Sequence, residues 1–167
     1  LGDWWVSPEV YPDGLAPLIE HVTGLGMEFG IWVEPEMVNP DSDLFRAHPE
    51  WALTTDGYDP VLGRNQLVLD LGRPEAFEHV LGLLDALLRD HDIAYVKWDM
   101  NRNITEPYGL ALPADRQGEF FHRYLLGVYE LYRRLTSRFP DILFESCASG
   151  GGRFDPGMLA FAPQAWT

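Results

Sequence analysis

Three segments of the chain repeat apolar residues at helical spacing. The first covers residues 13–24, and the second covers residues 74–89, where Pro74 suits the first helical turn. The third covers residues 118–138 and has the longest apolar stripe, at Phe121, Tyr124, Leu125, Val128, Leu131 and Leu135. These spacings predict three helices.

Short apolar runs lie between and around the predicted helices. They cover residues 27–34, 67–70, 93–101 and 142–146, and a further run begins at Gln164. Runs of this length are typical of buried strands. Because strands and helices alternate, we expect a parallel sheet with helices outside it.

The predicted fold class is α/β: a partial (β/α)8 barrel of about five strands, forming one domain over residues 1–167. A closed eight-stranded barrel needs about 250 residues, so we expect strands to be missing on both sides. The ends also look truncated, because Leu1 is not an initiator Met and Thr167 follows an apolar-flanked stretch. A doubly wound sheet is the alternative, but the chain has no G-x-G-x-x-G motif.

The run at residues 93–101 begins apolar and becomes polar where the strand should end. Side chains alternate along a strand, so Lys97, Asp99 and Asn101 share one face and Trp98 takes the other. In parallel barrels, catalytic groups lie at the carboxyl ends of the strands. The simpler interpretation is a structural Lys–Asp ion pair, but three polar groups on one face favour a site.

Trp32, Glu34 and Glu36 form a second polar-ended group, after the run at residues 27–34. A tryptophan ring could stack on a sugar, or it could fill the core. Glu34 could be a catalytic carboxylate, although a carboxylate at a strand end more often accepts hydrogen bonds from a neighbouring Arg or from backbone amides.

Glu145, Cys147 and Ser149 share a face at the end of the fourth run. No His is spaced to activate Cys147, so a cysteine nucleophile is not expected. The glycine-rich residues 149–153 lack the Walker spacing and suit a loop that lets a ligand approach the backbone. Arg64 could anchor a ligand or be a surface charge.

Composition narrows the function classes. A formal net charge of -14 argues against nucleic acid or anionic membranes as partners. The single cysteine excludes an internal disulfide, and the five histidines show no ligand spacing, so we expect no zinc and no cofactor. No signal-peptide pattern is present, which predicts a cytoplasmic protein.

Four blocks of the chain, in order, resemble glycoside hydrolase family 36, the α-galactosidases often called melibiases. The most specific block is KWDMNR at residues 97–102, which resembles the nucleophile motif of that family. The others are WVEPEM at residues 32–37, the segment at residues 64–70, and ESCASGGGR at residues 145–153. The resemblance runs along nearly the whole chain.

The resemblance implies a role for each matching residue. Asp99 would be the nucleophile that forms a covalent galactosyl-enzyme, in a retaining double displacement. Lys97 and Asn101 would bind galactose hydroxyls, and the positive charge of Lys97 would also keep Asp99 ionised. The remaining sugar-binding residues would be Trp32, Arg64, Cys147 and Gly150.

The same resemblance places two parts of the site outside these residues. The acid/base aspartate would follow the motif that begins at Gln164, just after Thr167, and a galactose-binding Asp–Asp pair would precede Leu1. The 167 residues alone would therefore be inactive, and they would belong to a longer enzyme that hydrolyses terminal non-reducing α-D-galactosides such as melibiose and raffinose-family sugars. Members of the family are often tetramers.

Several alternatives stay open at this point. Within the enzyme class, the chain could transfer galactose as raffinose synthases do, or could act on α-N-acetylgalactosaminides. A magnesium-dependent barrel enzyme could use Asp99, Glu34 and Glu145 as oxygen ligands. A non-catalytic sugar-binding module is the remaining class.

Overall fold

Four parallel strands form the main sheet of the computed structural model, which describes all residues 1–167. In spatial order they are β1 (Gly30–Val33), β4 (Tyr95–Trp98), β5 (Leu143–Ser146) and β6 (Gln164–Ala165). All three pairings are parallel. The carboxyl ends of the strands therefore lie at the same end of the sheet.

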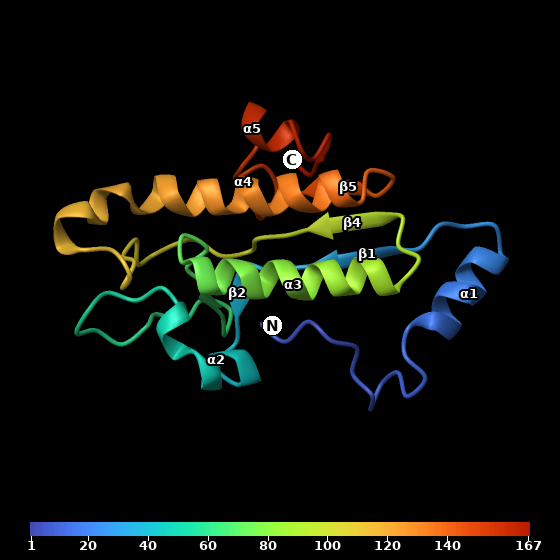
Figure 1. Cartoon of the computed structure of the whole chain (residues 1–167), viewed down its shortest axis with the longest axis horizontal. Helices are drawn as coiled ribbons and strands as arrows, with labels where there is room; N and C mark the ends of the chain where they lie inside the picture. Colours follow the sequence, from blue (N-terminus) through green and yellow to red (C-terminus); the bar gives the residue numbers. More distant parts are fainter.

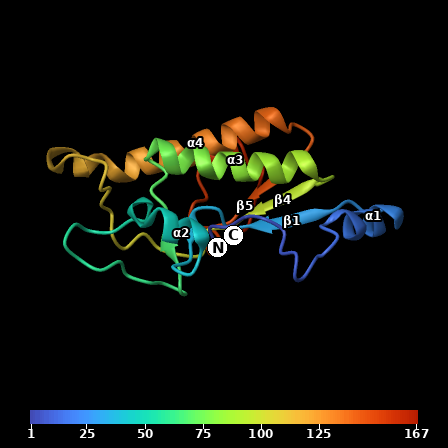
Figure 2. The same ribbon diagram turned by 60° about the horizontal axis from the view of Figure 1, so that its bottom comes forward.

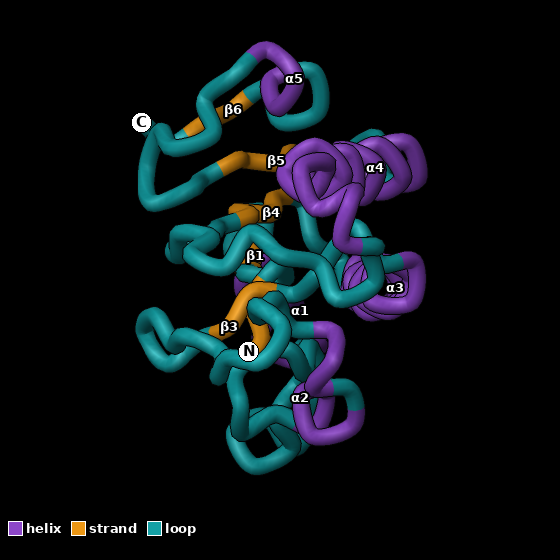
Figure 3. Tube along the Cα trace, turned by 90° about the vertical axis from the view of Figure 1, so that its left-hand side faces the viewer, coloured by secondary structure: helices purple, strands orange, loops and turns teal.

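Two long helices, α3 (Pro74–Asp90) and α4 (Phe120–Arg138), cover one face of this sheet (Figures 1 and 2). In the end-on view, both lie on the same side of the column of strands (Figure 3). Strand alternation accounts for this, since Val96 and Trp98 of β4 are buried and Lys97, between them, is only half-buried. Trp98 stacks on Tyr132 of α4, with ring centroids 4.3 Å apart.

The shorter elements lie in the connections. They are α1 (Ala16–Gly24), α2 (Asp43–Ala47), α5 (Pro156–Leu159) and two 3-10 helices (Pro49–Trp51 and Ala114–Glu119). The start of α2 is defined locally, because the Ser42 hydroxyl accepts a hydrogen bond from the backbone N–H of Phe45 at 3.0 Å.

The run at residues 67–70 is a strand, but it does not belong to the parallel sheet. As β3 (Leu67–Val68) it pairs antiparallel with β2 (Met37–Val38), in a separate two-stranded sheet. The parallel sheet thus has four strands instead of the expected five or so. Both β2 and β3 are fully apolar and buried, and such a run does not reveal the direction of its partner.

The apolar stripe predicted for the third helix is correct except near its start. The buried residues of α4 are Phe120, Tyr124, Val128, Leu131, Tyr132 and Leu135. The prediction that Phe121 belongs to the core is wrong, because this residue is 52% exposed. Leu125 is only half-buried. A 3-10 helix, Ala114–Glu119, leads directly into α4, and Phe120 rather than Phe121 packs against the core.

Gly127 is expected to be essential for the packing of α4. A Cβ atom at Gly127 would overlap the backbone carbonyl of Leu71. Because this neighbour is backbone, it cannot move aside as a flexible side chain could. We expect Gly127→Ala to destabilise the full-length polypeptide by about 1–3 kcal/mol, measured as a lower midpoint of urea unfolding. The matched control is Gly82→Ala on α3, where no atom lies within 4 Å of the new Cβ. Helix propensity predicts that this control is neutral or stabilising, and equal losses at both glycines would contradict the packing argument.

Candidate functional site

The polar residues predicted from the sequence meet at the carboxyl end of β1, β4 and β5. The strand register places Lys97 between Trp32 on one side and Glu145 on the other. Beyond the strands, the backbone N–H of Asp99 donates to Val33 O at 2.8 Å, and that of Met100 donates to Cys147 O at 3.0 Å. These bonds hold Asp99 between the two neighbouring strands.

Asp99 is 7% exposed and is surrounded by hydrogen-bond donors. The Trp32 indole N–H donates to Oδ2 at 3.1 Å, and the Met100 backbone N–H donates to Oδ1 at 2.9 Å. Burial opposes ionisation of Asp99, but hydrogen bonds from Cys147, Asn101, Trp32 and Met100 outweigh it and lower the pKa of the carboxyl. The group is therefore an anion at neutral pH.

Lys97 forms its ion pair with Glu145 and not with Asp99. Its Nζ lies 3.0 Å from Glu145 Oε1 and 4.2 Å from the centroid of the Trp166 ring. The hydrogen bond to Glu145 is the main cause that raises the pKa of Lys97, and the charge of Asp99 adds little. Neutral donors, rather than the expected ammonium of Lys97, thus keep Asp99 ionised.

Trp32 has a second role that the sequence did not reveal. Trp32 is 43% exposed, so it does not simply fill the core. The indole N–H meanwhile binds Asp99. The sequence gives one indication of this bond: alternation places Trp32 and Asp99 on the same face of neighbouring parallel strands.

Arg64 and Asn101 meet at the rim of the site. Arg64 is exposed, and its Nη1 lies 3.5 Å from the backbone carbonyl of Asn101. Arg64 and Asn65 occupy a tight hairpin turn between Gly63 and Gln66, with φ of 53° and 59°. Two consecutive non-glycine residues in this region are strained, and such strain is concentrated at functional sites.

Cys147 and Gly150 lie together at the end of β5. Cys147 is buried, and its Sγ accepts the backbone N–H of Gly150 at 3.5 Å. Burial, with a contribution from Asp99, raises the pKa of the thiol, so Cys147 remains protonated and serves as a donor to Asp99. The turn is tight, with φ of 51° at Ser149 and 88° at Gly150. A buried thiol with a raised pKa is a poor nucleophile.

Glu34 and Glu36 are structural carboxylates. Glu34 accepts the backbone N–H of Asn101 at 2.7 Å, which orients the segment after β4. Glu36 is fully buried and accepts hydrogen bonds from both terminal guanidinium nitrogens of Arg153, at 2.7 and 2.8 Å. It also accepts the Trp98 indole N–H at 2.9 Å and the Tyr124 hydroxyl at 2.6 Å.

The Glu36–Arg153 pair is not evident from the sequence. Both residues lie in quoted motif blocks, but nothing in either block indicates that they touch. The pair ties the loop that carries Gly150 to the segment after β1, and so supports the site from the helix-covered side.

Metal ligation has little support among these carboxylates. No group of three or more His, Cys, Asp or Glu residues is arranged to hold a metal ion. Glu34 and Glu145, two of the three ligands considered for magnesium, are already bound to protein donors.

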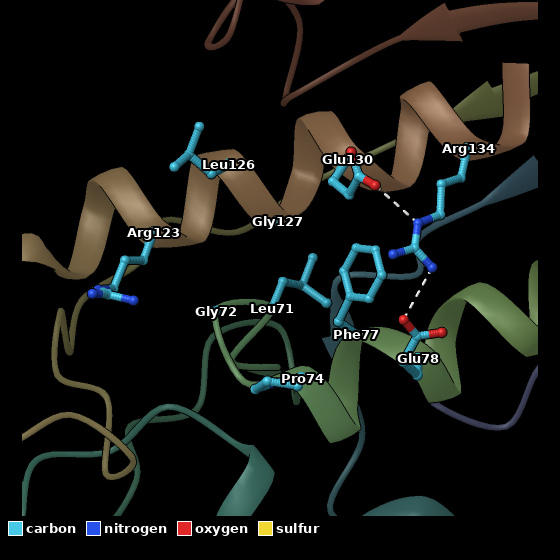
Figure 4. Close-up of a pocket in the computed structure, with 10 residues that line it drawn as sticks. All are labelled: Leu71, Gly72, Pro74, Phe77, Glu78, Arg123, Leu126, Gly127, Glu130 and Arg134. Carbon is cyan, nitrogen blue, oxygen red and sulfur yellow. Dashed lines mark hydrogen bonds and ion pairs between the residues drawn. The ribbon is translucent and has the colours of Figure 1, made fainter. Parts of the chain in front are cut away.

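A groove lies away from this site, between α3 and α4 (Figure 4). It has a volume of about 520 Å³ and is lined by Leu71, Gly72, Pro74, Phe77, Glu78, Arg123, Leu126, Gly127, Glu130 and Arg134. Arg134 crosses it and pairs with Glu130 at 2.9 Å and Glu78 at 3.0 Å. The groove is on the helix-covered side, whereas Lys97 and Asp99 lie on the other face.

No helix of the chain has the length and apolar character needed to cross a bilayer.

Comparisons with known proteins cover this entire chain. The family model described as Melibiase matches residues 1–167. Alpha-galactosidase AgaA of Geobacillus stearothermophilus is 52% identical over 167 residues, which are 100% of this chain and 23% of that protein. The chain thus spans about a quarter of the length of the curated relatives it matches.

Solved structures agree with the sequence comparison. Alpha-galactosidase AgaB of G. stearothermophilus superposes with a TM-score of 0.97 at 53% identity, again covering 100% of this chain and 23% of that one. Variants of AgaA in complex with raffinose and with stachyose match with a TM-score of 0.96, at 52% and 51% identity and with the same coverage. The parallel sheet, the four sequence blocks and the family match along all 167 residues place this chain in the melibiase family, glycoside hydrolase family 36.

Proposed function

We propose that this chain is part of the catalytic (β/α)8 barrel of an α-galactosidase, which hydrolyses terminal α-D-galactosides with retention of configuration. The observation that carries the proposal is the Asp99 carboxylate. It is buried, ionised and ringed by neutral donors at the carboxyl end of β4. The raffinose and stachyose bound by relatives with a TM-score of 0.96 support α-galactosides as the substrate class.

In the proposed mechanism, an oxygen of Asp99 attacks the anomeric carbon of galactose. The bond to the leaving oxygen breaks as that oxygen takes a proton from the acid/base residue, and a covalent galactosyl-enzyme forms. Water that gives its proton back to the acid/base residue then attacks the anomeric carbon and frees Asp99. The donors around Asp99 fix its orientation for attack and keep it anionic.

The other inward residues would bind the sugar. The open face of Trp32 is proposed to stack on the apolar side of the galactose ring. Lys97 and Asn101 are proposed to bind its hydroxyls, and Arg64 with the Cys147–Gly150 turn would line the pocket. Glu34, Glu36 and Glu145 are each engaged by protein donors, which supports assigning the acid/base role to a different residue.

The test uses the full-length polypeptide that contains this chain. We expect it to release nitrophenol from nitrophenyl α-D-galactoside, and proton NMR should show α-galactose as the first-formed anomer. First-formed β-galactose would contradict the double displacement. The isolated 167 residues are expected to show no substantial turnover, because the matched relatives are about four times as long.

A further inference from the structure

The ammonium group of Lys97 is held from two sides. Glu145 Oε1 lies 3.0 Å from Nζ, and the ring centroid of Trp166 lies 4.2 Å from it. These contacts come from β5 and from the residue after β6, which are the next two strands beyond β4 in the sheet (Figure 3). The lysine side chain has a flexible four-carbon stem, so its ammonium group is normally mobile unless contacts such as these fix it.

Glu145 is itself immobilised, with one oxygen left for Lys97. The carboxylate is 3% exposed. Its Oε2 accepts the hydroxyl of Tyr95 and the amide N–H of Gln164, the latter at 2.6 Å. Its Oε1 is buried and accepts no hydrogen bond from any other donor, so the ammonium of Lys97 is the only group that compensates it.

We propose that Glu145 is a positioning residue, which holds the ammonium of Lys97 in the direction from which it binds a hydroxyl of the substrate sugar. This inference rests on the proposed function, and extends it to a residue that does not itself touch the sugar. The ring of Trp166 closes the other side of the ammonium by a cation–π contact. The pair also keeps Lys97 charged, because Glu145 raises its pKa.

This arrangement predicts an effect on binding more than on chemistry. An ammonium that is already oriented loses little freedom when it binds a sugar hydroxyl. Without Glu145, part of the binding energy would be used to order the Lys97 side chain. A contact present in both the ground state and the transition state raises KM when it is lost and leaves kcat nearly unchanged.

A purely structural role for Glu145 is the competing interpretation. In that case the carboxylate would only join β4 to β5 through Tyr95 and Lys97. Removing it would then affect the enzyme whether or not position 97 carries an ammonium. The two interpretations differ in a double-mutant cycle between positions 97 and 145.

The experiment measures KM and kcat of the full-length polypeptide on nitrophenyl α-D-galactoside, and the Kd of D-galactose by calorimetry. We expect Glu145→Gln to raise KM and Kd about 10-fold, with kcat changed by less than about 3-fold. In a Lys97→Met background, the same substitution should change KM by less than about 2-fold. Glu106→Gln is the matched control, because Glu106 is also a buried carboxylate but contacts Thr105 and Arg102 instead.

Tyr95→Phe is a second variant, in case Glu145→Gln does not fold. It removes one donor that orients Glu145 without altering a charge, and should raise KM about 3-fold only when Lys97 is present. An equal rise in KM in both backgrounds, or a folded Glu145→Gln protein with the KM of the unmodified enzyme, would overturn the inference. If the unmodified polypeptide fails to cleave the galactoside, the proposed function fails instead, so the two failures are distinguishable.

Discussion

Asp99→Asn is expected to lower kcat of the full-length polypeptide on nitrophenyl α-D-galactoside by about 10⁴-fold or more. An amide oxygen is a poor nucleophile, so no galactosyl-enzyme can form at a useful rate. Asparagine has the same shape as aspartate and retains one of the two oxygens, which can still accept the N–H of either Trp32 or Met100. The folded site should therefore persist, and the Kd of D-galactose measured by calorimetry should change by less than about 10-fold.

The matched control for this change is Asp141→Asn, which replaces an exposed aspartate and should leave kcat unchanged. A second variant, Asp99→Ala, identifies the nucleophile directly. Azide entering the space left by the carboxylate should attack the α-galactoside and give β-galactosyl azide, with activity restored in proportion to azide. Turnover by Asp99→Asn within about 10-fold of the unmodified enzyme would place the nucleophile elsewhere.

The pH dependence of the unmodified enzyme follows from the same group. Hydrogen bonds outweigh burial and hold the pKa of Asp99 below its ordinary value of 3.8. A carboxyl with a lowered pKa stays ionised until the pH falls through that value, so the acid limb of kcat/KM due to Asp99 should lie below about pH 4. The interactions that depend on this charge stabilise the fold above that range and are lost below it.

Arg153→Met is expected to destabilise the full-length polypeptide by about 3–5 kcal/mol, measured as a lower midpoint of urea unfolding. Arg153 makes two hydrogen bonds to Glu36, at 2.7 and 2.8 Å, and Glu36 is fully buried. Methionine would fill part of the volume but would leave an uncompensated carboxylate among apolar residues. The donors that remain, Trp98 and Tyr124, are neutral.

An arginine in a different environment serves as the control. Arg134 also pairs with glutamates, Glu78 and Glu130, but on the exposed groove between α3 and α4 (Figure 4). Arg134→Met should therefore lower stability by less than about 1 kcal/mol. Adding Glu36→Gln to Arg153→Met should recover part of the loss, because a neutral amide needs no cation. Equal effects of the two Arg→Met changes would show that burial of the Glu36–Arg153 pair is not what matters.

Secondary structure was the part of the fold most accessible from the sequence. The stripe of α3 was predicted to within a residue of its observed end, because Pro74 fixes its start and Phe77, Val80 and Leu84 repeat at helical spacing. The runs that became β4 and β5 were found for a similar local reason. The run at residues 67–70 was assigned to the wrong sheet, since an apolar dipeptide such as Leu67–Val68 is compatible with either direction of pairing.

The candidate site also has one part that the sequence predicts and one part that it does not. Alternation along β4 was sufficient to place Lys97, Asp99 and Asn101 on one face, because that period is a local property of an extended chain. The distant partners of those side chains are not predictable from the sequence, because they lie on other strands. Lys97 is 48 residues from Glu145 in the chain, and Asp99 is 67 residues from Trp32.

By itself, the sequence determined the helices, the strands of the parallel sheet, the inward face of β4 and, through its motif blocks, the family. Only the tertiary structure decided that Glu145 rather than Asp99 is the ion-pair partner of Lys97, that Trp32 donates to Asp99, and that Arg153 compensates Glu36. The physical reason is the separation along the chain over which each interaction acts. Periodicity and turn chemistry act between neighbours in the chain, whereas charge pairing and burial depend on which strands the fold brings side by side.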